Sequence, residues 1–444
     1  MAKLTIRFKT ANSLSLIIVI RQDLFSYFCK KRTPLNKRKI LNDPVYGFIT
    51  IPSELLFDLV EHPYFQRLRR IRQLGMADLV YPGALHTRFH HALGAMHLMG
   101  QALKSLQEKG HLIWEPECEA AQIAILLHDI GHGPFSHVLE NTLLSGVPHE
   151  QLSLLLMKAL NQKMNGRLDL AIQMFQGTYP RPFFHQLVSS QLDMDRLDYL
   201  NRDCFYTGVA EGTIGASRII KMLDIHKDEL VIEEKGLLSI ENFLNARRLM
   251  YWQVYLHKTS LCAEAMLTQI IRRARDLSEA GTSLYASPDL GFFLKNRTTL
   301  DDFKGQPELL QTFSRLDDYD VWSALKAWAQ HDDLVLSTLC QALLNRHLFK
   351  IQFLDSPPGP ELLGTLHQQL AAQGVPQELF SYFLVEGQTT NSAYIAGEDQ
   401  IRVKMKNGAV VDIVEASELP TIQALSKIVR KYYVSWAKTV SLRA

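Results

Sequence analysis

The residues best suited to chemistry in this sequence are an adjacent histidine and aspartate, His128 and Asp129. They end an apolar run of helix-forming residues, 120–127, and glycines and a proline follow directly to stop the helix. Imidazole nitrogen and carboxylate oxygen are mixed ligands that suit Zn, Mn or Fe. Because a neighbouring pair fills only part of a coordination sphere, we expect further ligands elsewhere in the chain.

Two other segments offer such ligands. Residues 86–91, with the sequence His-Thr-Arg-Phe-His-His, open a helical pattern and bring histidines and an arginine to one place. Downstream, the helical segment 192–199 carries aspartates at 193, 195 and 198. The order of these groups along the chain is histidine, then histidine–aspartate, then aspartate.

That order is the signature of the HD metal-dependent phosphohydrolases, and six sequence blocks extend the resemblance. The blocks are 42–49, 65–75, 81–94, 126–137, 149–151 and 193–208. Over roughly residues 39–350 the chain resembles the dNTP triphosphohydrolase branch of the HD superfamily. The resemblance implies hydrolysis of deoxynucleoside triphosphates, dGTP included, to deoxynucleoside and inorganic triphosphate.

The resemblance also implies a metal site with catalytic histidines beside it. The metal ligands would be His91, His128, Asp129 and Asp195. A divalent ion bound there, Mn, Fe, Zn or Mg, would lower the pKa of bound water and polarise a phosphoryl oxygen. His132 and His149 would act as acid or proton-shuttling groups, and His137, with its tautomer fixed by Glu140, would contact the triphosphate.

Seven further positions match substrate-binding residues of the family. They are Gln73, Arg88, Arg196, Tyr199, Asp203, Arg247 and Tyr255. The guanidinium groups of the three arginines are permanently charged and would donate paired hydrogen bonds to phosphate oxygens. Gln73 and Asp203 would bind the 3′-hydroxyl, and Tyr199 would crowd the 2′ position and so favour deoxyribonucleotides. The dNTP triphosphohydrolase branch includes the vertebrate sterile-alpha-motif and HD-domain dNTPase, and Tyr251 stands where that enzyme has a histidine, which leaves base preference open. For Tyr251 and Tyr255, core packing is an equal alternative.

A third set matches the family's allosteric pockets, where nucleotides bound between subunits assemble an active oligomer. The set is Lys39, Gln66, Arg69, Arg218, Lys258, Arg346 and Lys350. Glu61 stands where the vertebrate enzyme has aspartate. We therefore expect a homo-oligomer, either dimer or tetramer, and an activating nucleotide is an open possibility.

Composition sets broad limits on these interpretations. The chain has 444 residues, enough for a large catalytic domain with a smaller one appended. The net charge of +2 gives nucleic acid no support as a partner. Five cysteines without a CxxC pair predict reduced thiols and a cytoplasmic protein. The apolar run 14–20 is far shorter than the ~20 residues that span a bilayer, so no membrane association is expected.

The expected fold is mainly α, an HD-domain helical core with a small C-terminal α+β subdomain. The predicted divisions are a variable extension 1–36, a catalytic domain 37–355 and a subdomain 361–444, after the Pro-rich linker 356–360. Predicted helices are 53–60, 63–74, 88–109, 117–127, 151–160, 183–201 and 240–277. An extended segment is expected at 48–51, a hairpin within 221–236, and a second hairpin from strands 401–405 and 411–413 joined by Asn407-Gly408.

Two competing functions remain open at this stage. An HD phosphodiesterase or nucleotidase would act on cyclic, oligomeric or monophosphate nucleotides, although Gln73, Tyr199 and Asp203 argue against it. A catalytically idle nucleotide sensor, or a nucleic-acid-binding regulator, would not need a complete set of metal and histidine positions.

Overall fold

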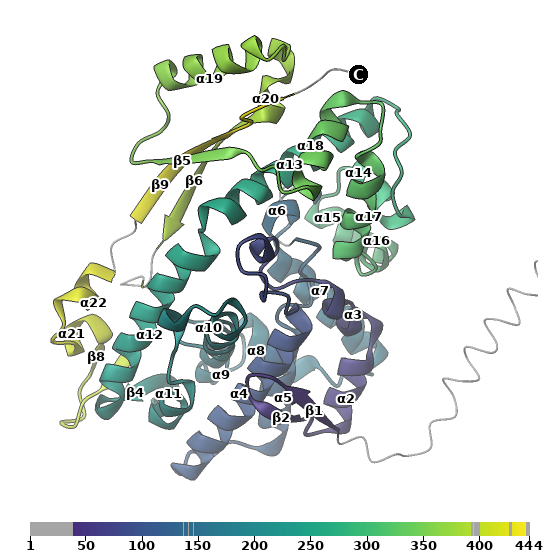
Figure 1. Ribbon diagram of the computed structural model, residues 1–444. Helices are drawn as coiled ribbons and strands as arrows, with labels where there is room; N and C mark the ends of the chain where they lie inside the picture. Colours follow the sequence, from purple (N-terminus) through teal and green to yellow (C-terminus); the bar gives the residue numbers. More distant parts are fainter. Residues whose placement is uncertain are drawn as a thin grey trace, which may run out of the picture.

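The computed structural model describes residues 39–440 apart from Ser136, Asn141, Ser145, 392–393, 395–399 and 426–428. The predicted extension 1–36 lies outside this part of the chain. The fold is mainly α, as expected, with small β-sheets set against the helices (Figure 1). Among the described helices, none is both long enough and apolar enough to cross a membrane.

The centre of the first half is α4, Arg88–Glu108, which packs against α5, Glu115–Leu127, and α10, Met194–Thr207. Residues on most sides of α4 are buried, from Phe89 through Leu106, as expected of a helix surrounded by others. Around this core lie α2 (Glu54–Glu61), α3 (Pro63–Gln66), α6 (His137–Glu140), α7 (His149–Lys163), α8 (Asp169–Gln176) and α9 (Phe183–Val188). The packing of α4 against α5 and α10 brings the predicted ligand segments together.

The second half is built on α13, Lys258–Glu279, which runs toward α14 and α18 and packs against both (Figure 1). The remaining helices of this half are α11 (Ala216–Met222), α12 (Leu237–Met250), α14 (Pro288–Lys295), α15 (Leu300–Gly305), α16 (Pro307–Phe313), α17 (Asp318–Trp328) and α18 (Leu334–Leu344). Most of α13 is apolar on the faces that meet α14 and α18. Burial of these apolar faces holds α13 against the helices that follow it in the sequence.

The predicted single helix 240–277 was wrong, because the chain divides there. After α12 the backbone forms a π-helical turn, Tyr251–Tyr255, and α13 begins anew at Lys258. The His257 side chain caps the new helix by accepting from the backbone N–H of Thr259 at 3.2 Å. Such π turns change the direction in which side chains project, and they are frequent at functional sites.

Two other predicted helices were too long. The helix expected over 63–74 ends at Gln66 and tightens into a 3₁₀ turn, Arg67–Arg70, after which Arg72 forms a β-bridge with Thr87. The helix expected over 183–201 is two helices, because Asp193 caps α10. Its carboxylate accepts from the backbone N–H groups of Ser190 and Arg196, both at 2.7 Å.

Nine strands form three small sheets in the described part of the chain. The strands are β1 (Ile40–Asp43), β2 (Gly47–Thr50), β3 (Leu223–His226), β4 (Glu229–Glu233), β5 (Lys350–Leu354), β6 (Leu384–Asn391), β7 (Arg402–Lys404), β8 (Val410–Asp412) and β9 (Val429–Trp436). The sheet orders are β1-β2, β3-β4-β7-β8 and β5-β9-β6. Both predicted hairpins are present, as β3-β4 and as β7-β8 with an Asn-Gly connection.

The sheets join parts of the chain on either side of the predicted domain border. Strand β7 pairs in parallel with β4, and β5, which precedes the linker 356–360, pairs with β9 near the C-terminus. The last helices are α19 (Pro360–Ala372), α20 (Phe380–Phe383), α21 (Ile413–Ala416) and α22 (Pro420–Leu425). The predicted α+β character of this region is present, whereas its division from the catalytic domain stays a prediction.

Candidate metal centre and substrate cavity

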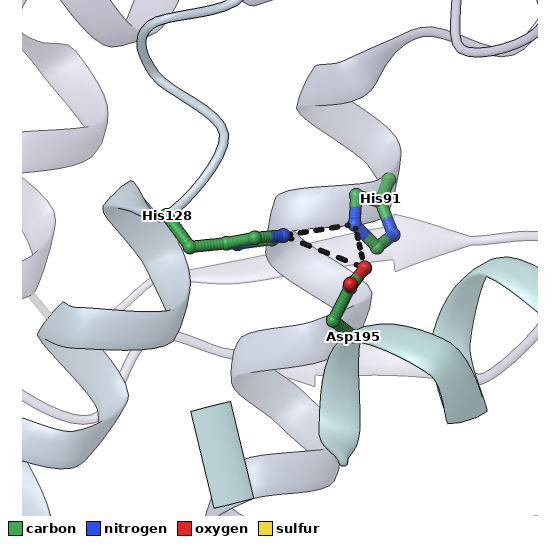
Figure 2. A group of neighbouring side chains, drawn as sticks. All are labelled: His91, His128 and Asp195. Atoms are coloured by element: carbon green, nitrogen blue, oxygen red, sulfur yellow. Dashed lines mark hydrogen bonds and ion pairs between the residues drawn. The ribbon is translucent and has the colours of Figure 1, made fainter. Parts of the chain in front are cut away.

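Three predicted ligands meet where α4, α5 and α10 converge. His91 Nε2 lies 3.0 Å from Asp195 Oδ1 and 3.4 Å from His128 Nε2, and His128 Nε2 lies 3.5 Å from the same Asp195 oxygen. Figure 2 shows the three side chains directed at one another. Atoms that bind one ion at about 2.0–2.2 Å are roughly 3.0–3.5 Å apart in octahedral or tetrahedral geometry. The residues present therefore fit a divalent metal ion.

The secondary structure explains how each ligand reaches this point. His91 lies in the first turn of α4, His128 directly follows the last residue of α5, and Asp195 lies in the first turn of α10. The helix ends are held by caps, including the Asp193 cap of α10. Ligands at helix ends are therefore placed by the packing of the helices.

The outer nitrogens of both histidines are already occupied. His91 Nδ1 lies 2.8 Å from Asp198 Oδ2, and His128 Nδ1 lies 2.6 Å from the carbonyl oxygen of Ile125. Each Nδ1 can donate its proton to that oxygen, which leaves the lone pair on Nε2 for a metal ion. Such partners are typical of metal-binding histidines.

Asp129, the fourth predicted ligand, lies beside this trio. Its Oδ1 is 3.3 Å from His128 Nε2 and 3.2 Å from His132 Nε2, and its Oδ2 accepts from Arg88 Nη1 at 2.5 Å. Arg88 was expected to bind phosphate. In the structure one of its N–H groups donates to the carboxylate of Asp129, and its binding of phosphate stays a prediction.

Burial and charge make this group of residues a site for a cation. Burial alone would raise the pKa of Asp129, but His128, His132 and Arg88 outweigh it and hold the pKa well below its ordinary range. Likewise burial would lower the pKa of His91, yet Asp195 and Asp198 raise it to about 10. A metal ion would therefore compete with a proton for His91, so metal affinity would depend on pH.

Two of the three predicted catalytic histidines stack beside the ligands. The rings of His132 and His149 lie 3.8 Å apart at an angle of 21°. Burial, and then the charge of Arg88, hold the pKa of His132 well below its ordinary range. Glu140 Oε1 accepts from the backbone N–H of His149 at 2.9 Å and lies 3.4 Å from its Nδ1. The side chain of His137, and so its predicted contact with Glu140, lies outside the described part of the chain.

A cavity of about 470 Å³ opens from these residues. Asp129, His132, His149 and Asp195 line one part of it. The predicted substrate-binding residues that line it are Gln73, Arg88, Arg196, Tyr199, Asp203 and Tyr255. A volume of this size is typical of small-molecule sites.

Asp203 is held rigidly in the wall of this cavity. Its Oδ1 lies 2.6 Å from His86 Nε2, and its Oδ2 accepts from the hydroxyl of Tyr255 at 2.8 Å. Tyr255 also packs edge-on against Tyr199, with ring centroids 5.9 Å apart. Near them, Gln73 Oε1 is buried without a hydrogen-bond partner among the described residues. A ligand hydroxyl could donate to that oxygen.

The predicted phosphate-binding arginines differ in position. Arg196 lines the cavity, where its Nε donates to the carbonyl oxygen of Ser190 at 2.6 Å. Arg247 is buried, its Nη1 donates to Gln191 Oε1 at 3.3 Å, and it is absent from the residues that line the cavity. Tyr251 and Tyr255 both line the cavity from the π turn.

The predicted allosteric positions are engaged in contacts within the chain. Gln66 Oε1 accepts from Arg69 Nε at 2.8 Å, and the Arg69 guanidinium lies 3.5 Å from the ring centroid of Phe89. Four of the other positions contact different elements: Lys39 with Phe57, Arg218 with Ser239, Arg346 with Leu79 and Lys350 with Trp436. Lys258 is the first residue of α13. Within this set Gln66 and Arg69 contact each other, and the allosteric role stays a prediction.

Four residues around the site had no role assigned from their sequence positions: Asp198, Arg202, His86 and Glu264. Asp198 and Arg202 form a buried network behind His91, His86 orients Asp203, and Glu264 lines the cavity from α13. The spacing of Asp195, Asp198 and Arg202 by three and four residues was a usable signal, because it predicts side chains on adjoining faces of one helix. For Glu264 the sequence offered no comparable signal.

The chain is similar to known proteins that contain an HD domain. A model of the HD domain matches residues 88–180, and a model of the HD-associated region matches residues 214–304. A solved structure of a phosphohydrolase from Bacteroides thetaiotaomicron has 54% sequence identity and a TM-score of 0.87, covering 90% of this chain and 99% of that chain. The fold and the site thus define an HD-domain hydrolase.

Two curated proteins narrow the relationship. The uncharacterized protein YwfO of Bacillus subtilis is 32% identical over 404 residues, which are 87% of this chain and 89% of YwfO. Human SAMHD1, a deoxynucleoside triphosphate triphosphohydrolase, is 29% identical over 304 residues, which are 58% of this chain and 48% of SAMHD1. The chain belongs to the HD-domain phosphohydrolase family, in the branch that includes the dNTPases.

Proposed function

We propose that the protein is a metal-dependent dNTP triphosphohydrolase, which cleaves at the α-phosphate to release deoxynucleoside and inorganic triphosphate. One observation carries the proposal: the His91–His128–Asp195 group borders a cavity whose walls hold Gln73, Tyr199 and Asp203. The resemblance to dNTPases supports the substrate class. We expect dGTP among the substrates, a homo-oligomer, and, from the cysteine pattern, a cytoplasmic location.

Each group has a role that follows from its position. A divalent ion held by His91, His128 and Asp195, with Asp129 beside them, would supply the Lewis acidity that activates water and polarises the phosphoryl group. Arg88 holds Asp129 in place. Arg196 would attract the polyphosphate into the cavity.

The stacked histidines, His132 and His149, would provide acid catalysis. Departure of the deoxynucleoside requires a proton on its 5′-oxygen, and His132 and His149 both reach the cavity. The Glu140 carboxylate, with its Oε1 3.4 Å from Nδ1 of His149, would orient that imidazole. His149, with this acidic neighbour, is therefore the better placed proton donor, and His132 would orient the attacking water.

The sugar would be recognised by other residues of the cavity wall. Gln73 and Asp203 offer acceptors for the 3′-hydroxyl, and Tyr199 beside Tyr255 restricts the space available to a 2′-hydroxyl. Buried polar groups that lose their ligand partner discriminate strongly against analogues that lack it.

Product analysis tests the proposal. The purified full-length protein is incubated with Mn²⁺ or Mg²⁺ and each of the four dNTPs, singly and then mixed. Deoxynucleoside and intact triphosphate should appear, should vanish in Asp195→Asn, and should persist in Asp301→Asn, where the side chain is 91% exposed. Activity only in mixtures would indicate nucleotide activation. Monophosphate or pyrophosphate as product would favour a phosphodiesterase or nucleotidase, and no turnover by metal-loaded protein would favour a sensor.

A further inference from the structure

A chain of buried charged groups leads from the N-terminal β1-β2 hairpin to the metal ligand His91. Its members are Asp43, Arg202, Asp198 and His91. The side chains of Arg202, Asp198 and His91 are 0% exposed and that of Asp43 is 5% exposed. Burying four ionisable groups is unfavourable unless each is paired, and here every neighbouring pair is in direct contact.

The contacts are directional at each step. His91 Nδ1 lies 2.8 Å from Asp198 Oδ2. Arg202 donates two hydrogen bonds to the same carboxylate, from Nε to Oδ2 at 2.9 Å and from Nη2 to Oδ1 at 3.0 Å. Its remaining Nη1 donates to Asp43 Oδ2 at 2.8 Å. A planar guanidinium in a bidentate pair fixes the plane of the carboxylate it binds.

The outer end of the chain is anchored in the backbone of the hairpin turn. Asp43 Oδ1 accepts from the backbone N–H groups of Val45 at 2.9 Å and Tyr46 at 3.0 Å. One carboxylate oxygen of Asp43 thus accepts hydrogen bonds from the turn backbone, and the other accepts from Arg202. The turn therefore determines where the guanidinium lies.

The helix that carries His91 is shaped to receive this chain. One turn beyond His91, Gly94 faces the pair, and a Cβ there would lie 2.0 Å from Asp198 Oδ1 and 2.2 Å from Arg202 Nη2. Real Cβ atoms are not found at such distances, so only glycine lets the ion pair lie against α4. The close approach brings Asp198 within hydrogen-bond reach of His91.

We propose that Asp43, Arg202 and Asp198 are positioning residues that hold His91 with its proton on Nδ1 and its Nε2 lone pair directed at the metal ion. The β1-β2 hairpin thereby contributes to metal affinity although it provides no ligand. This inference rests on the metal site of the proposed function, but it concerns metal binding alone and needs no substrate.

The test is the dissociation constant of Mn²⁺, measured by titration calorimetry on full-length variants whose fold is checked by circular dichroism. Loss of a partner that orients a metal ligand typically weakens affinity about 10–100-fold. We expect that range for Asp198→Asn and about 10-fold for Arg202→Lys, because a lysine cannot reproduce the fork. Asp43→Asn should weaken Mn²⁺ by at least about 3-fold.

The matched control is Glu117→Gln. Glu117 is also a buried carboxylate paired with an arginine, Arg181, at 3.0 Å, but it lies at the N-terminal end of α5, away from the ligands. The Glu117→Gln substitution should lower the free energy of unfolding while leaving the Mn²⁺ dissociation constant unchanged. Wild-type affinity in folded Asp43→Asn and Arg202→Lys would overturn the proposal and reduce the chain to a stabilising network.

A measurement on the wild-type protein covers the case in which variants do not fold. In the zinc-loaded protein, nitrogen chemical shifts of labelled histidine should place the His91 proton on Nδ1 and the metal on Nε2. The opposite assignment would contradict the proposal. If dNTP hydrolysis is absent yet these results hold, the proposed function fails and the positioning chain stands.

Discussion

His86 Nε2 lies 2.6 Å from Oδ1 of Asp203; both residues are buried, and Asp203 lines the cavity beside the metal ligands. Together with the Tyr255 hydroxyl at 2.8 Å from Oδ2, this contact leaves Asp203 little freedom to rotate. A carboxylate held in this way can present its remaining lone pairs to a ligand without losing side-chain entropy on binding.

The first prediction concerns this orientation. Tyr255→Phe removes one hydrogen bond to Asp203 and should lower kcat/KM for dNTPs about 5–10-fold, which corresponds to ~1 kcal/mol. The effect should be absent for 2′,3′-dideoxynucleotides, because they have no 3′-hydroxyl to bind. Tyr179→Phe is the control, since its hydroxyl donates to Glu117 at 2.7 Å and is not among the groups that line the cavity. An equal loss with dideoxynucleotides would contradict the assignment.

The second prediction concerns metal removal. Binding of Mn²⁺ at 100 times its dissociation constant stabilises the folded state by about 2.7 kcal/mol, so the melting temperature of the wild-type protein should fall by a few degrees in EDTA. Asp195→Asn should melt at the same temperature with or without Mn²⁺. Scanning calorimetry decides the question, with the exposed Asp301→Asn expected to behave as wild type. A metal-dependent shift that survives in Asp195→Asn would place the ion elsewhere.

Three of the predicted metal ligands, His91, His128 and Asp195, meet in the structure, because each comes from a local motif at a helix end; their binding of a metal ion stays a prediction. Asp198 and Arg202 were not predicted as partners of His91, because that relationship depends on how α10 docks on α4. Gly94 within α4 was a sign of close approach, but its partner cannot be read from one chain segment.

The interruption of the predicted helix 240–277 has a similar explanation. Residues 251–257 contain neither proline nor glycine, and their helical periodicity continues from α12. The π turn there is stabilised by contacts distant in sequence, such as the Tyr255 hydroxyl with Asp203. Arg247, predicted to bind phosphate, belongs to the part of α12 before this turn and is buried.

The third prediction concerns pH and stability. Burial raises the pKa of Glu264 to about 7 from an ordinary value of 4.5. Below pH 4.5 the carboxyl is protonated in both folded and unfolded protein and has no effect. As the pH rises toward 7, only the unfolded state ionises freely, so the folded state loses roughly 1–3 kcal/mol of relative stability. Glu264→Gln should therefore be more stable than wild type at pH 8 and similar to it at pH 4.5.

Chemical denaturation at the two pH values measures this difference. The control is Glu378→Gln, an exposed glutamate in a 3₁₀ turn, which should have little effect at either pH. If Glu264→Gln is no more stable than wild type at pH 8, then ionising Glu264 in the folded protein has no net cost, and the prediction is wrong. The comparison is best made without nucleotide, because a ligand in the cavity would itself bind the folded state.

The fourth prediction follows from the close approach at Gly94. Gly94→Ala places a Cβ where the Asp198 and Arg202 side chains lie, so the ion pair must move and His91 must lose its hydrogen bond. We expect overpacking to destabilise the protein by about 1–3 kcal/mol and Mn²⁺ affinity to fall about 10-fold or more.

Gly364→Ala makes the same chemical change within α19, where nothing lies within 4 Å of the added Cβ. In that exposed helix alanine should stabilise by up to ~1 kcal/mol and leave metal affinity unchanged. Calorimetric unfolding and Mn²⁺ titration of both variants separate the general effect of alanine in a helix from the specific effect on the ion pair. Unchanged Mn²⁺ affinity in Gly94→Ala would mean that α4 adjusts without displacing His91.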